Sequence, residues 1–300
     1  MLTKGLSAHL ALVCAVLVFA GSGCGDASGD GSVQQLESSG FFESDGLQIY
    51  YESHGEGTPM ILVHGWGTDM QTNWVTNGWV EALQVTRQVI LIDVRGHGES
   101  DKPLDQALYS YSVMANDVLN LMDTFGIEKA DFMGYSMGSF MGAYLLGHHT
   151  ARFNSMVLGG IGEEDDESLA TAQPIADALR AEDPSDITDP TGALYRQFVD
   201  LDPRIDDAAR EALALSALQM WPEGFPLELG GAGLTTVDIP VLVVNGEDDI
   251  PYVDTVQPFV DAIPGAELVT IPDREHFGAV LDERFKEEVL TFLANIGDTT

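Results

Sequence analysis

Short apolar segments recur from residue 47 to residue 271, and longer stretches with a helical period lie between them. Apolar runs of four to eight residues are typical of buried strands, whereas apolar residues spaced three and four apart indicate helices. The alternation predicts an α/β fold with a mostly parallel central sheet and helices on both faces. The expected strands are residues 47–53, 60–63, 89–92, 132–134, 156–159, 241–245 and 267–271. The expected helices include residues 72–83, 112–125 and 139–146.

The alternation stops between residues 162 and 237. An acidic run, residues 163–167, is expected to carry the chain off the sheet as a solvated segment. Helical patterns then cover residues 169–179 and 206–218, with turns expected near Pro184, Pro190 and Pro203. Residues 162–237 are therefore predicted to form a small helical cap, inserted between the two halves of one core domain, residues 41–161 and 238–297.

Polar and glycine-rich motifs follow five of the expected strands. Because the carboxyl ends of parallel strands share one edge of the sheet, functional groups gather at that edge. The motifs are HGWG at 64–67, DVRGHGES at 93–100, GYSMG at 134–138, NGEDD at 245–249 and EHF at 275–277. They direct the search for reactive side chains to one end of the predicted sheet.

The motif at 134–138 has the form G-x-S-x-G and stands between an expected strand and an expected helix. In this arrangement the serine lies on a strained turn, and its hydroxyl projects above the sheet. Glycines flank it because a side chain at either position would crowd the turn. Ser136 is therefore predicted to be a nucleophile; the alternative is a structural serine in a glycine-rich loop.

The five motifs, in this order, resemble those of the α/β-hydrolase fold superfamily, and the likeness runs from about residue 42 to residue 296. A serine nucleophile resembles the esterase- and lipase-like members, and argues against the dehalogenases and epoxide hydrolases of this fold, which use an aspartate. The resemblance implies a triad with Ser136 as nucleophile, His276 as general base and Asp249 as the acid. Asp248, the neighbouring acid, is the alternative to Asp249.

The same resemblance assigns the oxyanion hole to the backbone amides of Trp66 and Met137. The side chains of Trp66, Tyr135 and Met137 flank the catalytic motifs and are expected to line the substrate pocket. Trp221, near the end of the cap, is a further candidate for the pocket wall. Packing of the cap onto the core domain is the alternative for Trp221.

The N-terminal segment predicts export from the cytoplasm. Lys4 precedes an apolar run at residues 10–20, which is shorter than the roughly 20 residues that span a bilayer, so residues 1–24 are predicted to be a signal peptide. The residues before Cys24 resemble a bacterial lipoprotein cleavage site, although Gly21 stands where an aliphatic residue is usual. Cys24 is expected to carry the lipid and to attach the protein to the cell envelope. Secretion without a lipid is the alternative.

Residues 25–40 are mostly Gly, Ser, Asp and Gln and are expected to form a flexible tether. The chain has 48 acidic and 13 basic residues, a formal net charge of −35. Such a charge repels nucleic acid, so a nucleic-acid partner is not expected. The sequence has no Gly-rich phosphate loop and no regular spacing of metal ligands, so no cofactor and no metal are implied. His64 and His97 are expected to brace loops.

These features predict a serine hydrolase that forms an acyl-enzyme from a neutral, apolar ester or a related carbonyl compound. Hydrolysis of a lactone, an amide or a carbon–carbon bond, and a perhydrolase reaction, are alternatives that fit the same groups. A non-catalytic ligand-binding protein on the same scaffold is the alternative from another class.

Overall fold

The computed structural model describes residues 34–163, 169–250 and 252–297. The predicted signal segment with Cys24, the predicted tether up to residue 33, and residues 164–167 of the acidic run lie outside the described residues. Within the described ranges, no helix is both long and apolar enough to cross a bilayer.

In the part of the chain that the structure describes, eight strands form one sheet in the order β1-β2-β4-β3-β5-β6-β7-β8. β1 and β2 are antiparallel, β2 is antiparallel to β4, and all other neighbours are parallel. The prediction of an α/β fold with a mostly parallel sheet is confirmed. The strands are β1 (Ser39–Ser44), β2 (Leu47–His54), β3 (Thr58–Val63), β4 (Arg87–Ile92), β5 (Ala130–Tyr135), β6 (Phe153–Gly159), β7 (Val241–Gly246) and β8 (Glu267–Ile271).

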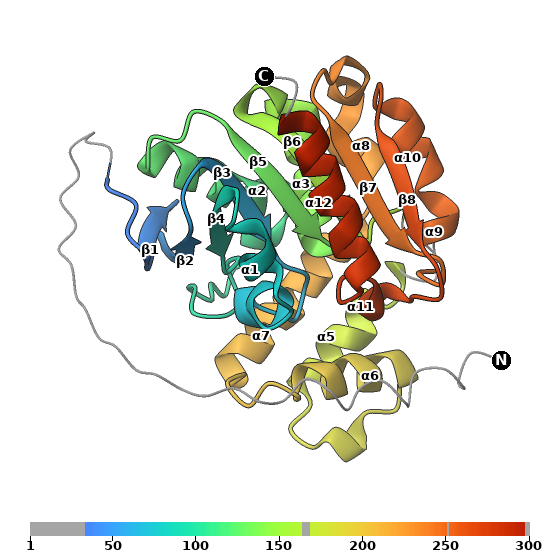
Figure 1. Cartoon of the computed structure of the whole chain (residues 1–300). Helices are drawn as coiled ribbons and strands as arrows, with labels where there is room; N and C mark the ends of the chain where they lie inside the picture. The colour runs from blue at the N-terminus through green and yellow to red at the C-terminus, as the bar shows by residue number, and fades with distance from the viewer. Residues whose placement is uncertain (1–33, 164–168, 251, 298–300) are drawn as a thin grey trace. The chain divides into compact units, whose positions relative to one another are not determined.

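Each face of the sheet carries its own apolar cluster, because successive residues of a strand point to opposite faces. In β3, Ile61 and Val63 belong to one cluster, and Met60 and Leu62 belong to the other. Burial on both faces explains why these strands are continuous apolar runs in the sequence. The first face is covered by α2 (Tyr111–Thr124) and α3 (Met137–His149), and the second by α1 (Trp79–Leu83) and α12 (Glu283–Gly297), with α12 in front of the sheet in Figure 1.

The sequence predicted one helix over residues 72–83, but the structure has two separate helical elements there. A short π-helix (Gln71–Val75) and α1 are separated by Gly78, which has a φ of 72°. This left-handed conformation interrupts a helix, and glycine adopts it without the strain that a side chain would add. The apolar spacing continues through the break, so the hydrophobic pattern did not reveal it.

Two of the elements that were not predicted are β1 and α6 (Pro190–Val199). β1 begins at Ser39, inside the last two residues of the predicted tether, because this segment pairs along its whole length with β2. α6 replaces the turn expected near Pro190. Its N-cap, Asp189, accepts a hydrogen bond from the Gly192 amide at 2.7 Å, and Pro190 stands at the first helical position, where proline is well tolerated.

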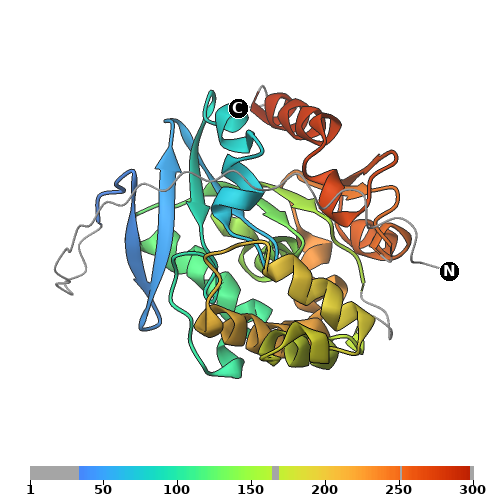
Figure 2. The same cartoon turned by 90° about the horizontal axis from the view of Figure 1, so that it is seen from below.

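The cap consists of α5 (Ala172–Arg180), α6 and α7 (Asp207–Met220). These helices pack on one another and lie beyond the carboxyl ends of the strands, as Figures 1 and 2 show from two directions. α8 (Pro226–Gly230) instead packs along α3, where a Cβ on Gly147 would lie only 1.8 Å from the carbonyl oxygen of Gly230. The C-terminal part of the predicted cap segment therefore packs on helices of the core domain.

Glu163, the one described residue of the predicted acidic run, is half-buried rather than solvated. Its carboxylate accepts a hydrogen bond from the Leu227 amide at 3.1 Å, and burial raises the pKa of this carboxyl. The contact ties the start of the inserted segment to α8. The remaining α-helices that the structure describes are short: α9 (Tyr252–Thr255), α10 (Gln257–Ala262) and α11 (His276–Ala279).

Candidate active site

Ser136 occupies the turn between β5 and α3. Its φ of 50° and ψ of −118° are values that L-residues rarely adopt. The turn is tightly packed: a Cβ on Gly134 would lie 2.4 Å from the backbone of Gly138, and one on Gly138 would lie 2.1 Å from the carbonyl oxygen of Val63. Both glycines of the G-x-S-x-G motif are thus required by close backbone approach. The half-buried serine is held at the carboxyl end of β5.

Three side chains from separate strand ends form one hydrogen-bonded chain. His276 Nε2 lies 2.9 Å from Ser136 Oγ, and His276 Nδ1 lies 3.0 Å from each carboxylate oxygen of Asp249. An ionised carboxylate only accepts hydrogen bonds, so Nδ1 carries the proton and Nε2 is left to accept from the serine hydroxyl. The arrangement can withdraw the Ser136 proton and stabilise the imidazolium that results.

The structure distinguishes the two candidate acids of the NGEDD motif. Asp249 is buried, with 2% of its surface exposed, and its carboxylate faces His276. The side chain of Asp248 is exposed, while its amide donates to the carbonyl of Arg274 at 2.8 Å. Asp249 is therefore the acid in contact with His276.

Tyr135 lies behind His276. Its hydroxyl donates to the backbone carbonyl of His276, and the two rings are 5.4 Å apart between centroids. Its ring packs with Phe285 of α12, in the apolar cluster on the second face of the sheet, whereas Trp66 and Met137 belong to the cluster on the first face. The structure thus places Tyr135 on the other face of the sheet from Trp66 and Met137, the two residues with which the sequence analysis grouped it as expected pocket residues.

Two backbone amides beside Ser136, those of Trp66 and Met137, have no acceptor among the described residues. Met137 is the first residue of α3, and the first amides of a helix have no partner within it. Trp66 belongs to the HGWG loop (residues 64–69), which passes so close that a Cβ on Gly65 would lie 3.5 Å from the Ser136 Cβ. Both amides are available to bind a developing negative charge.

Two buried histidines lie in the loops at this end of the sheet, His64 at the start of the HGWG loop and His97 in the DVRGHGES loop. Nε2 of His64 accepts from the Val94 amide at 3.0 Å, so its Nδ1 donates to the Gly65 carbonyl at 2.8 Å. His97 Nδ1 lies 3.1 Å from the carbonyl oxygen of Arg95. Burial lowers the pKa of His64 and lowers the pKa of His97 to about 3, so both rings are neutral at neutral pH. Their contacts connect loops, in agreement with the bracing role expected for them.

The aromatic side chains at the cap meet the HGWG loop. Trp66 packs in a T-shaped geometry against Tyr195 of α6, with ring centroids 5.5 Å apart, and against Trp221 at 5.2 Å. Trp66 is 6% exposed and Met137 is 1% exposed. For Trp221, the contacts fit the alternative of cap packing as well as that of a pocket wall.

Sequence reasoning missed two asparagines that hold the site together. The Asn73 side-chain oxygen accepts from the Gly65 amide at 2.8 Å and so fixes the HGWG loop. Asn245 bonds both the amide and the carbonyl of Ile161, at 3.1 and 2.8 Å, and ties the end of β7 to the loop after β6. Asn245 opens the NGEDD motif, so its position at a strand end was a usable signal; Asn73 offered none.

Among the residues that the structure describes, no group of three or more His, Cys, Asp or Glu side chains is arranged to hold a metal ion.

Comparison with known proteins identifies several relatives. The chain is 26% identical over 274 residues to the non-heme chloroperoxidase CPO-A1 of Kitasatospora aureofaciens, covering 83% of this chain and 97% of the relative. It is 26% identical over 277 residues to 2-hydroxy-6-oxo-6-(2'-aminophenyl)hexa-2,4-dienoic acid hydrolase of Metapseudomonas resinovorans, covering 87% and 92%. A third relative, the dihydrolipoyllysine-residue acetyltransferase component of the acetoin cleaving system of Pseudomonas putida, is 39% identical over 121 residues, and the match spans 39% of this chain and only 31% of that protein.

Solved structures share the architecture. A hydrolase from Pseudomonas aeruginosa PA01 superposes with a TM-score of 0.68 at 25% identity, covering 85% of this chain and 98% of that one. Est816, described as an N-acyl homoserine lactone degrading enzyme, superposes with a TM-score of 0.64 at 26% identity, covering 84% and 99%. The alpha/beta hydrolase fold family matches residues 58–217, more than half of the chain. The chain is a member of the alpha/beta hydrolase fold family.

Proposed function

We propose that this protein is a serine hydrolase that cleaves a neutral, apolar ester through an acyl-enzyme. The observation that carries the proposal is the continuous chain of hydrogen bonds from Ser136 through His276 to Asp249. The unpaired amides of Trp66 and Met137 stand beside it, where the charge of a tetrahedral intermediate would develop. Nucleophile, base, acid and oxyanion donors are the complete set that acyl transfer requires.

In the proposed reaction, Ser136 Oγ attacks the ester carbonyl while His276 Nε2 takes the hydroxyl proton. The carbonyl oxygen becomes an oxyanion held by the two amides, and His276 then gives the proton to the departing alcohol. Water attacks the resulting ester of Ser136 in the same way, with His276 as base, and releases the carboxylic acid. Asp249 keeps the histidine proton on Nδ1 throughout.

The surroundings of His276 support an apolar substrate. The rings of Tyr252 and Phe277 lie 5.4 and 5.5 Å from the His276 ring between centroids, and Trp66 and Met137 add apolar surface on the HGWG side. The formal net charge of −35 disfavours approach of a polyanionic substrate.

The test is intact-mass analysis after exposure to a fluorophosphonate, together with hydrolysis of p-nitrophenyl esters of graded chain length. One adduct is expected on the wild type, none on Ser136→Ala, and slow labelling on His276→Ala. Ser155→Ala is the matched control, since this buried hydroxyl bonds Asp131 and not the site. A folded wild type that takes no adduct and cleaves no ester would contradict the proposal and favour a ligand-binding protein.

A second candidate is perhydrolysis, favoured by the likeness to the chloroperoxidase over 97% of its length. Hydrogen peroxide would replace water as the nucleophile, forming a peracid and restoring the Ser136 hydroxyl. The rates of peracid formation and of ester hydrolysis should be measured on the same ester in the presence of hydrogen peroxide. Their ratio gives the fraction of acyl-enzyme that reacts with peroxide instead of water. Ser136→Ala should abolish both reactions.

We further propose that Cys24 carries a lipid and retains the protein at the cell envelope. The support is the short apolar run followed by small residues and Cys24 in the sequence. Metabolic labelling with an alkynyl fatty acid should mark the wild type and not Cys24→Ser. Release of unlabelled wild type into the medium would instead indicate plain secretion.

A further inference from the structure

The cap contacts the HGWG loop directly. The indole Nε1 of Trp66 donates to Ser216 Oγ of α7 at 2.8 Å, and Ser216 is fully buried. The next residue, Gly67, faces α6: a Cβ built on it would lie 3.0 Å from the ring of Phe198. The loop that bears the Trp66 amide is therefore packed against two different cap helices.

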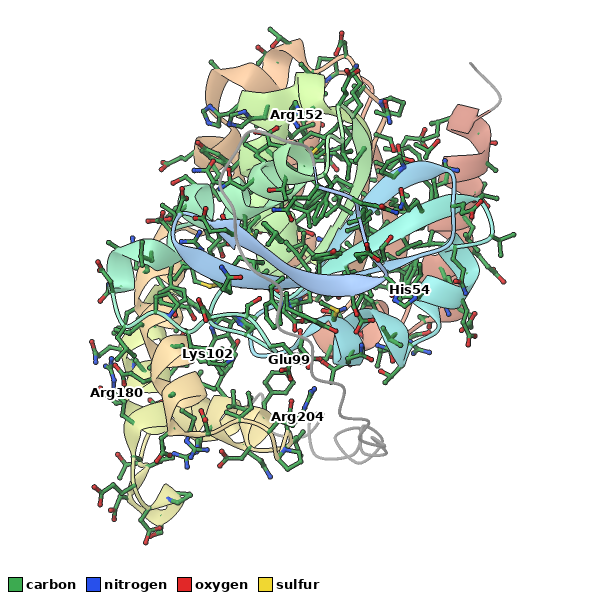
Figure 3. The ribbon with its side chains drawn as sticks, turned by 90° about the vertical axis from the view of Figure 1, so that its left-hand side faces the viewer. His54, Glu99, Lys102, Arg152, Arg180 and Arg204 are labelled. Atoms are coloured by element: carbon green, nitrogen blue, oxygen red, sulfur yellow. The ribbon has the colours of Figure 1, made fainter. Side chains whose placement is uncertain are left out.

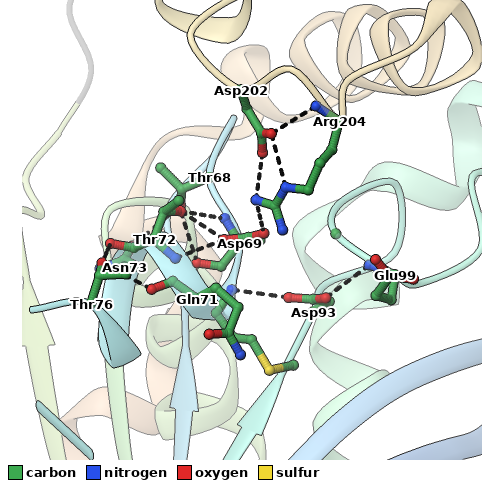
Figure 4. A network of polar contacts seen from close by, with 12 residues as sticks. Thr68, Asp69, Gln71, Thr72, Asn73, Thr76, Asp93, Glu99, Asp202 and Arg204 are labelled. Carbon is green, nitrogen blue, oxygen red and sulfur yellow. Dashed lines mark hydrogen bonds and ion pairs between the residues drawn. The ribbon is translucent and has the colours of Figure 1, made fainter. Parts of the chain in front are cut away.

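An ion pair forms a third contact between the cap and the loop. Arg204, in the segment between α6 and α7, places Nη2 2.6 Å from the carboxylate of Asp69, which is 4% exposed. Asp202, which belongs to the cap, accepts a hydrogen bond from the same guanidinium at 2.6 Å, and Figure 4 shows both contacts. The other carboxylate oxygen of Asp69 accepts from the Thr72 amide. Asp69 thus connects the cap to the residues that follow the loop.

Ser216 restrains Trp66 more closely than packing alone would. An indole nitrogen only donates, and the Ser216 hydroxyl donates its own hydrogen to the Leu213 carbonyl at 2.9 Å, so its oxygen is free to accept from Trp66. Tyr195 and Trp221 pack in a T-shaped geometry against the indole. With the indole fixed in place and direction, the backbone that carries the Trp66 amide has little freedom to rotate.

We propose that Ser216 is a positioning residue for the oxyanion hole: through the indole of Trp66, the cap holds the Trp66 amide in the direction that binds the oxyanion. The inference rests on the proposed hydrolase function. It gives the cap a part in arranging the groups that would act on the substrate. Because Ser216 acts through Trp66 and not on the substrate, its loss should slow the chemical step without changing ground-state binding.

Ser216→Ala removes the acceptor and leaves a buried indole N–H without a partner, which favours movement of the loop toward another acceptor. Losing an oxyanion donor outright costs roughly 10²–10³ in kcat, so a displaced donor should cost about tenfold. We expect kcat to fall by that factor with KM nearly unchanged. A trifluoromethyl ketone, which forms an oxyanion on Ser136, should bind about tenfold more weakly, while a product alcohol should bind as to the wild type.

Two controls separate positioning from general destabilisation. Ser155→Ala also removes one buried, hydrogen-bonded hydroxyl, but at the opposite end of the sheet, and should leave kcat and the ketone affinity unchanged. Trp66→Phe removes the indole donor and keeps the amide. If Ser216 acts through the indole, adding Ser216→Ala to Trp66→Phe should change kcat little further.

The ion pair offers an independent variant at a partly exposed position. Arg204→Gln removes the contact with Asp69 and should lower kcat by about threefold, since a partly exposed ion pair contributes modestly. Arg180→Gln is its matched control: Arg180 has a similar exposure, but it pairs with Glu211 inside the cap. Figure 3 labels both arginines on the cap. Arg180→Gln should leave kcat unchanged.

The first experiment measures fluorophosphonate labelling, kcat, KM and ketone inhibition on the wild type, Ser216→Ala and Ser155→Ala. Support for the proposal is a lower kcat and a weaker ketone affinity in Ser216→Ala alone. Wild-type kinetics and ketone affinity in a folded Ser216→Ala, or an equal loss in Ser155→Ala, would overturn the positioning role while leaving the hydrolase intact. A wild type that takes no adduct would overturn the hydrolase function and this inference with it. If Ser216→Ala does not fold, the contrast between Arg204→Gln and Arg180→Gln decides.

Discussion

The hydroxyl of Tyr135 donates a hydrogen bond to the backbone carbonyl of His276, so the residue before the proposed nucleophile also holds the proposed base. The contact joins the end of β5 to the start of α11 across 141 residues of sequence. Burial raises the pKa of this phenol far above its usual range, so Tyr135 stays a hydrogen-bond donor at every pH at which the protein would work. Ser136 and His276 are therefore positioned by one shared element.

Tyr135→Phe tests this arrangement with the smallest change available. The variant keeps the ring that packs on His276 and Phe285 but loses the bond to the His276 carbonyl. We expect kcat to fall about three- to tenfold, because one neutral hydrogen bond contributes roughly 1 kcal/mol, with little change in KM. Steady-state kinetics on a p-nitrophenyl ester measures both values. An unchanged kcat would mean that packing alone positions His276.

The two acids of the NGEDD motif should differ sharply on substitution. Asp249→Asn replaces a charge-assisted contact with His276 Nδ1 by one that favours the wrong tautomer, so kcat should fall on the order of 10³-fold or more. Asp248→Asn changes an exposed side chain and should leave kcat within about twofold. Ester hydrolysis and fluorophosphonate labelling by the pair measure the contrast. Equal losses in both variants would show that the loop rearranges in solution.

The strands and the motifs at their ends were predictable because their signals are local. An apolar run with glycines after it identifies a buried strand and its turn within about ten residues of sequence. The face of the sheet on which Tyr135 lies could also have been predicted, although the prediction missed it. Side chains two residues apart in a strand point to the same face, so Met133 and Tyr135 lie on one face and Phe132 lies on the other. Ending the predicted strand at residue 134 hid that relationship.

The contacts between distant segments had no such signal. Ser216 lies 150 residues after Trp66, and Arg204 lies 135 residues after Asp69, so nothing in either neighbourhood points to its partner. The break at Gly78 was hidden for another reason: a single left-handed residue interrupts a helix without changing the apolar spacing around it. Such features depend on tertiary packing, so they cannot be predicted from a single sequence before the fold is known.

A buried ion pair provides a test of stability away from the site. Arg95 and Asp117 are both completely buried and form two parallel hydrogen bonds, at 2.8 and 2.6 Å, that join the DVRGHGES loop to α2. Arg95→Met leaves the Asp117 carboxylate buried without its cation, which typically costs about 3–5 kcal/mol of unfolding free energy. Chemical denaturation should show this loss. Replacing both residues with apolar side chains should recover part of it, and no recovery would indicate that polar contacts from Ser44 dominate instead.

Asp93 should make the stability of the protein depend on pH. Burial, reinforced by the charge of Asp69, raises the pKa of Asp93 to about 7, although the amides of Met70 and Glu99 donate to its carboxylate. Below about pH 4 the group is protonated in both the folded and the unfolded state. As the pH rises, the unfolded chain releases the proton first, so the free energy of unfolding falls until Asp93 itself ionises near pH 7.

Asp93→Asn removes this titration. Relative to the wild type, the variant should gain roughly 2–4 kcal/mol of unfolding free energy between pH 4 and pH 8, because one pKa unit corresponds to about 1.4 kcal/mol. His97, whose pKa burial lowers to about 3, makes stability rise with pH between about 3 and 6.5, but it is present in both proteins and cancels from the comparison. Urea denaturation of both proteins at several pH values gives the difference. Parallel stability curves would show that Asp93 is ionised in the folded protein well below pH 7, and that its two amide donors outweigh its burial.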